Sequence, residues 1–183
     1  MFRNASRSLT TCDEVYEYAL SLLDRREHGE KELVQKLQRR CSSAGLIREA
    51  VAKLKEYDLL KEERYAKRVF ESWRARKVYG RLHLQAELLK KQVGEAYIPV
   101  ILAMLSEEEE AQRVQAAYRQ IAGRRDKKYD CTTEKGVAAL ARYFAARGFG
   151  PSMIRIGLAL AKETATSSSQ DVLFKMIKQY PWF

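Results

Sequence analysis

Apolar residues recur at helical spacing through most of the chain, in clusters separated by short polar breaks. Leu33 and Leu37 lie four residues apart. A second cluster follows at spacings of four and three residues and consists of Ile47, Val51 and Leu54. Residues at such spacings share one face of a helix. The pattern therefore predicts two amphipathic helices with a break between them.

The same arrangement occurs three times along the chain. Three glycines mark it, at separations of 51 and 56 residues: Gly29, Gly80 and Gly136. The same two offsets place apolar residues on apolar residues, which gives the equivalent sets Leu33, Leu84 and Leu140, then Leu37, Leu88 and Phe144, then Ile47, Ile98 and Ile154. Amphipathic helices can resemble one another by chance, but the coinciding glycines favour a true internal repeat.

Each repeat also contains a preceding helix, which the spacing predicts over 15–26, 63–77 and 108–122. A glycine lies near each break between the second and third helices, at Gly45, Gly94 and Gly148. Glycine is favoured at helix ends because it adopts the left-handed conformation without strain. Three helices are therefore predicted to recur three times.

Local signals predict several helix starts. Capping-box patterns begin at Thr11 and Ser106, and Pro151 suits a first helical position. A proline at position 99 predicts that the sixth helix starts near Tyr97 or Ile98. The acidic run over 107–110 fits a helix N-terminus, where negative charge is stabilising, and needs no catalytic role.

The predicted fold class is all-α: three tandem three-helix repeats forming an elongated curved array, with a short C-terminal helical tail. The 183 residues include only 9 glycines and 3 prolines, which disfavours a sandwich or barrel, and 46% are hydrophobic, enough for a sizeable core. The predicted segments are an N-terminal extension (1–12), repeats over 13–60, 61–105 and 106–163, and a polar linker with the tail (164–183). The tail ends in Trp182 and Phe183, which we expect to pack on the third repeat, the alternative being a partner.

The charge balance points to an acidic or polyanionic partner. Thirty-four lysines and arginines face 24 acidic residues, which gives a net charge of +10. Three isolated cysteines, Cys12, Cys41 and Cys131, predict no disulfide framework and fit a reducing compartment. No apolar run approaches the roughly 20 residues of a membrane span, and the first residues lack a signal peptide, so we expect a soluble, cytoplasmic monomer.

No arrangement of residues in the sequence suggests catalysis. Only His28 and His83 are present, 55 residues apart, and neither belongs to a zinc-binding motif. The cysteines lack a histidine at ligand spacing, which favours structural thiols. Phosphate-binding glycine loops and the serine nucleophile motif are also missing. The sequence thus predicts a protein that is not an enzyme and that uses no metal or cofactor.

Basic residues concentrate in two stretches that span predicted helix ends. They are Arg74, Arg76, Lys77, Arg81, Lys90 and Lys91 in the first stretch, and Arg113, Arg119, Arg124, Arg125, Lys127 and Lys128 in the second. Three aromatic residues lie close by in sequence: Trp73, Tyr79 and Tyr129. Cations could bind phosphates while a ring stacks on a base. A solvated basic face is the alternative interpretation.

Several segments resemble the RecX family of bacterial recombination regulators. Residues 26–37, REHGEKELVQKL, are similar to the family's opening Arg-x-x-Ser-x-x-Glu-Leu-x-x-Lys-Leu pattern. Residues 59–66, LLKEERYA, resemble its Leu-Leu-Asp-Asp-x-x-Phe/Tyr-Ala junction, residues 79–88, YGRLHLQAEL, its Lys-Gly-x-x-Arg-Ile-x-x-Glu-Leu segment, and residues 147–149 its Arg-Gly-Phe. The resemblance covers roughly 15–162. Gly29 replaces a usual serine, and Lys61 and Glu62 replace paired aspartates.

The resemblance implies a non-enzymatic regulator that binds the RecA recombinase. Such a protein lies in or near the groove of the RecA filament on single-stranded DNA and suppresses ATPase and strand exchange. The basic residues above then become candidates for contact with the filament or with nucleic acid. Two alternatives stay open: a helical-repeat protein that binds DNA or RNA directly, and a helical adaptor that holds an acidic protein through the Trp182 and Phe183 end.

Overall fold

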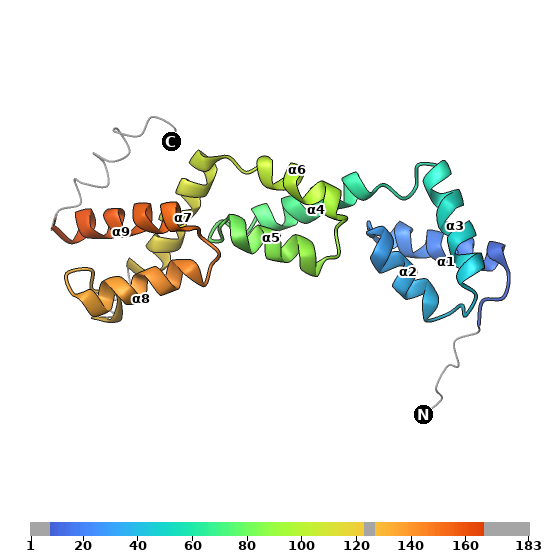
Figure 1. The fold of residues 1–183 in the computed structure, drawn as a ribbon, viewed down its shortest axis with the longest axis horizontal. Coiled ribbons are helices and arrows are strands. Elements are labelled where there is room, and N and C mark those ends of the chain that lie inside the picture. The colour runs from blue at the N-terminus through green and yellow to red at the C-terminus, as the bar shows by residue number, and fades with distance from the viewer. Residues whose placement is uncertain (1–7, 123–126, 167–183) are drawn as a thin grey trace, which may run out of the picture. The chain divides into compact units, whose positions relative to one another are not determined.

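A computed structural model describes residues 8–122 and 127–166, and all regular structure within them is helical. The nine α-helices of this part (Figure 1) are α1 (Cys12–Arg25), α2 (Glu30–Gln38), α3 (Ala44–Glu56), α4 (Glu62–Arg74), α5 (Arg81–Lys90), α6 (Ile98–Ala103), α7 (Glu107–Ala122), α8 (Glu134–Ala145) and α9 (Pro151–Thr166). Short 3-10 helices cover Glu95–Tyr97 and Lys127–Tyr129. The all-α prediction is confirmed.

The predicted helix starts are also confirmed. Thr11 forms a complete capping box with Glu14. The Ser106 hydroxyl accepts the Glu109 backbone N–H at 3.1 Å. Helix α6 begins at Ile98 and helix α9 at Pro151. The predicted apolar tail beyond Thr166 lies outside the described residues.

The predicted helix ends need correction. Helix α4 stops at Arg74 instead of reaching residue 77, and α9 continues past residue 163 to Thr166. Gly45 lies inside the first turn of α3, so it does not end a helix. Of the three glycines expected at breaks, Gly148 alone has a positive φ, 75°.

The same pattern of backbone hydrogen bonds ends α5 and α8, although the left-handed residue differs between them. The Val93 N–H donates to the Leu88 carbonyl at 3.1 Å, as the Phe149 N–H donates to the Phe144 carbonyl at 3.3 Å. The residue before each donor is left-handed, Gln92 in one repeat (φ 56°) and Gly148 in the other. The hydrogen-bonded turn outweighs the strain of a Cβ at Gln92.

The apolar repeat positions form the cores. Two of the predicted sets have no exposed surface: Leu33, Leu84 and Leu140, and Leu37, Leu88 and Phe144. In the third set Ile47 and Ile98 are buried and Ile154 is partly buried. The described residues up to Ser72 group with Glu87–Ile101 in one compact unit, and Trp73–Ala86 group with the described residues from Leu102 in the other. In the first unit α1, α2 and α3 pack on one another, and in the second α9 packs on α7 and α8 (Figure 1).

Candidate interaction surface

In the first compact unit, Glu62 of α4 caps a helix of the preceding repeat. Gly29 precedes α2 and offers no side-chain cap. The Glu62 carboxylate instead accepts the Glu30 backbone N–H at 2.9 Å and the Gly94 backbone N–H at 2.9 Å. A Cβ on Gly29 would lie 2.7 Å from the Tyr65 ring, which explains why a small residue fits there. The cap that Gly29 cannot supply thus comes from α4.

Glu110 of α7 plays the same part in the second unit. Its carboxylate accepts the Arg81 backbone N–H at 2.8 Å, at the first residue of α5, and the Arg81 Nε at 3.3 Å. The Arg81 guanidinium also donates to the carbonyls of Leu102 and Leu105. Gly80, directly before α5, packs closely against the turn that follows α8, since a Cβ there would lie 2.5 Å from the Gly148 carbonyl oxygen.

The third repeat is capped differently. The Thr133 hydroxyl accepts the Gly136 backbone N–H at 3.1 Å, so α8 carries a cap of its own. Gly136 therefore lies inside α8, whereas Gly29 directly precedes α2 and Gly80 directly precedes α5. The three glycines recur in sequence, but Gly136 lies in a different part of its helix from Gly29 and Gly80.

Arg113 of α7 holds the other end of α4. Its side chain is 4% exposed and its guanidinium lies 4.2 Å from the centre of the Trp73 ring. It donates to the carbonyls of Arg74 at 2.8 Å and Arg76 at 3.0 Å, and to Glu109 at 2.9 Å. A cation at a helix C-terminus stabilises its unpaired carbonyls.

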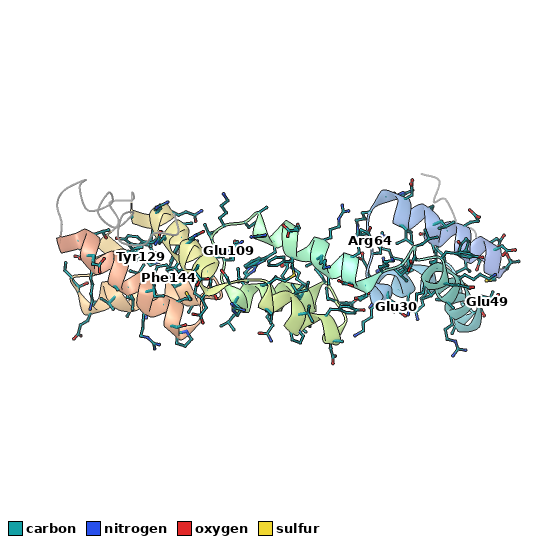
Figure 2. The ribbon with its side chains drawn as sticks, turned by 90° about the horizontal axis from the view of Figure 1, so that it is seen from above. Glu30, Glu49, Arg64, Glu109, Tyr129 and Phe144 are labelled. Carbon is teal, nitrogen blue, oxygen red and sulfur yellow. The ribbon has the colours of Figure 1, made fainter. Side chains whose placement is uncertain are left out.

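Glu109, at the start of α7 (Figure 2), is shared by two arginines. It accepts bonds from Arg113 and forms an ion pair with Arg74 at 3.0 Å. Burial raises the pKa of Glu109, but the hydrogen bonds from Arg113 and Arg74 outweigh burial, and the pKa lies below its usual value. The carboxylate is therefore ionised at neutral pH.

The structure separates the predicted basic residues into different environments. Arg74 pairs with Glu109, Arg76 lies 5.7 Å from the centre of the Tyr79 ring, and Arg81 is hydrogen-bonded as above. Lys128 lies 5.4 Å from the centre of the Tyr129 ring. Lys77, Lys90 and Lys91 are exposed and form no ion pair among the described residues. Arg124 and Arg125 lie outside the described part of the chain, as does the Lys127 side chain.

The predicted stacking of bases on nearby rings is not supported for Trp73, which has no exposed surface. Its indole N–H donates to His83 Nδ1 at 3.0 Å. The Tyr79 ring is already stacked on His83, with centroids 4.0 Å apart, and Tyr129 packs edge-on against Tyr143. The rings lie near cations in sequence, but in the structure they contact other side chains of the protein.

The sequence does not reveal two features of the second unit: that Arg113, a member of the second basic stretch, is buried, and that the acidic run of α7 bonds to other helices. From sequence, Glu109 and Glu110 are predicted only to favour the start of α7. A signal was available, because an offset of 48 residues carries Glu62 onto Glu110 and Ala66 onto Val114. That alignment would have marked both glutamates as equivalent.

In the first unit several polar side chains surround His28, which is 2% exposed. Its Nδ1 lies 2.9 Å from the Arg26 carbonyl and its Nε2 lies 2.8 Å from Lys36 Nζ. Burial lowers the His28 pKa. Glu32 is also partly buried, which raises its pKa, but hydrogen bonds from Arg26 and Lys36 prevail and lower it to about 2.

Metal-binding clusters and membrane-spanning helices are both absent from residues 8–122 and 127–166. No group of three or more His, Cys, Asp or Glu side chains there could hold a metal ion. Among the helices of these residues, none is long and apolar enough to cross a membrane.

Comparisons with known proteins agree with the fold. A family model described as RecX, first three-helix domain, matches residues 16–54. A crystal structure of RecX from Lactobacillus salivarius superposes with a TM-score of 0.73 at 18% identity, covering 82% of this chain and 96% of that one. A second crystal structure, of regulatory protein RecX, has a TM-score of 0.69 at 17% identity and covers 79% of this chain and 71% of that one. At these identities the likeness concerns the fold alone.

Sequence relatives carry the name Regulatory protein RecX. The relative from Pseudomonas fluorescens SBW25 is 39% identical over 94 residues, which cover 51% of this chain and 60% of that protein. The chain thus spans about three fifths of that relative's length. The Pseudomonas putida relative is 33% identical over 150 residues, 81% of this chain and 92% of that protein. With similarity extending over nearly the whole of that relative, the chain belongs to the RecX family of regulatory proteins.

Proposed function

We propose that this protein regulates the RecA recombinase by binding RecA and its filament on single-stranded DNA. It lowers ATPase activity and strand exchange in recombination and repair, and it catalyses no reaction of its own. The observation that carries the proposal is membership of the RecX family, whose relatives are named regulatory proteins. The proposal includes a cytoplasmic monomer without metal or cofactor.

The charge of the chain supports this partner. The net charge is +10, and a protein of such charge is attracted to nucleic acid and to acidic protein surfaces. Lys77, Lys90 and Lys91 are exposed without ion pairs among the described residues, so they can contact a partner at little cost. Inhibition then needs no catalytic group, since a protein that prefers one filament state shifts the filament toward that state.

Direct binding to DNA or RNA without RecA is the second candidate function. It predicts tight, salt-sensitive binding to bare polynucleotide. The buried Trp73 ring and the stacked Tyr79 ring weigh against it, because base stacking is a main source of affinity for single strands.

The test is the single-stranded-DNA-dependent ATPase rate of RecA with increasing amounts of the protein. Its binding to the same bare DNA is measured beside it at two salt concentrations. We expect substoichiometric loss of ATPase at a salt concentration where bare-DNA binding is weak. Loss that appears only when the protein coats the DNA favours the second candidate, and no loss at any ratio contradicts the proposal.

A further inference from the structure

A polar groove runs along α7 within the second compact unit. Its volume is about 670 Å³. Arg74 and Lys77 line it together with a stripe of α7 formed by Glu108, Gln112, Gln115, Ala116 and Arg119. Residues three and four apart on a helix share a face, so the stripe is a continuous surface of α7.

Contacts within the protein already hold the Arg113 side chain of this groove in place. Arg113 lines the groove and lies on the Trp73 ring, with its guanidinium bonded to Glu109 and to two carbonyls at the end of α4. Glu109 is held in turn by Arg74. A preformed surface loses little conformational entropy on binding, and this favours affinity.

Charge changes sign along this stripe of α7. Glu108 lies in the acidic first turn of α7, Gln115 lies near the middle, and Arg119 lies in the last turn. Arg119 and Lys77 are both exposed, and neither forms an ion pair within the part of the chain that the structure describes. Two unneutralised cations thus line one groove whose far end is acidic.

We propose that this groove binds an acidic segment of a partner protein. Lys77 and Arg119 contact its carboxylates, while the Gln115 amide bonds to its main chain. Clusters of basic side chains recognise acidic peptides in this way. The inference deepens the proposed function and rests on it in one respect: the segment belongs to the regulated recombinase.

The graded charge favours a protein over a nucleic acid. A polynucleotide carries a negative charge at every nucleotide, so a strand following the groove would pass Glu108 as well as Arg119. A peptide can place its acidic residues opposite Lys77 and Arg119 and other residues opposite Glu108. No ring surface in the groove is open for stacking either, because Trp73 lies beneath Arg113.

The test compares two double variants that each remove two positive charges from the second unit. Lys77→Ala with Arg119→Ala removes the groove cations. Lys135→Ala with Arg142→Ala is the matched control, since both residues are exposed on α8 and lie outside the groove. A short fluorescent oligoglutamate peptide, a bare dT oligonucleotide and the RecA filament on the same oligonucleotide are the three probes.

We expect the groove variant to bind the oligoglutamate peptide and the RecA filament about fivefold more weakly than the unaltered protein, the effect of losing two exposed ion pairs. The control should change by less than about twofold with both probes. Affinity for bare dT should fall equally in both variants, because it follows total charge.

Three results would overturn the groove assignment. Equal losses of peptide affinity in the two variants would mean that only total charge matters. Unchanged peptide and filament affinity in the groove variant would show that Lys77 and Arg119 do not contact the partner. A selective loss of dT affinity in the groove variant would make the groove a nucleic-acid site. The unaltered protein's effect on RecA reports the proposed function separately, because the peptide arm needs no RecA.

Discussion

Replacing Glu110 of α7 with alanine should destabilise the second compact unit, because Glu110 caps a different helix, α5. The carboxylate is 4% exposed and caps α5 by accepting the Arg81 backbone N–H at 2.8 Å. Losing a helix cap costs about 1 kcal/mol. Losing the bond from Arg81 Nε adds about 1 kcal/mol, at the low end of the range for charged partners, because the Arg81 side chain is 34% exposed and water can replace the carboxylate.

The expected loss is therefore about 2 kcal/mol, which lowers the melting temperature of a protein of this size by about 4–8 °C. Glu107→Ala is the matched control. Glu107 lies in the same turn of α7, is exposed, and forms no ion pair among the described residues. Its replacement should cost no more than about 0.5 kcal/mol from the helix dipole. Thermal and urea unfolding followed by circular dichroism measure both variants.

Hydrogen exchange at the Arg81 amide locates the effect. This N–H donates to Glu110, so its exchange should accelerate in Glu110→Ala and stay unchanged in Glu107→Ala. Glu110→Gln keeps an acceptor oxygen and should fall between the alanine variant and the unaltered protein. Equal melting temperatures for Glu110→Ala and Glu107→Ala, with equal Arg81 exchange, would refute the reasoning that a residue of α7 caps α5.

Three further predictions follow from the same structure. Glu62→Ala should cost about 1–2 kcal/mol and accelerate exchange at the Glu30 amide, whereas the exposed Glu56→Ala should do neither, as unfolding and exchange measurements can check. Gly148→Ala should cost at least about 2 kcal/mol in urea unfolding, since its φ is 75° and a Cβ would lie 2.2 Å from the His83 backbone nitrogen; a neutral result would contradict the close approach. In the folded protein the pKa of His28 lies below the usual histidine value of about 6.5, so the unfolded state takes up the proton first, and stability should fall as pH drops from about 6.5 toward the lower folded pKa. Melting temperatures measured across that window should fall less in His28→Gln, and an identical pH slope in both proteins would show that His28 is not responsible.

Sequence reasoning was sufficient where one physical rule acts locally. Helical spacing identified Leu33, Leu84 and Leu140 as buried, because a face that repeats in sequence must be covered in each repeat. Capping patterns placed the starts of α1 and α7, since the hydroxyl and the amide that it caps lie within one turn.

The helix ends were less predictable because the left-handed residue need not be glycine. Gln92 adopts that conformation where Gly148 does in the next repeat, and the same backbone turn forms at both. A rule based on glycine therefore missed Gln92 and wrongly selected Gly45, which lies in a helix. Hydrogen bonds of the turn, which sequence does not display, decided the outcome.

The use of each charge was decided by tertiary structure. From sequence, Arg81 and Lys77 are equivalent members of one basic cluster. In the folded chain Arg81 binds Glu110 and two carbonyls far along the sequence, whereas Lys77 is exposed at a groove. Sequence determined the all-helical class, the main core positions and the net charge, because each depends on residue type and local spacing. Only the packing of α4 and α7 against the helices before them determined which of those charges stabilise the fold and which stay exposed.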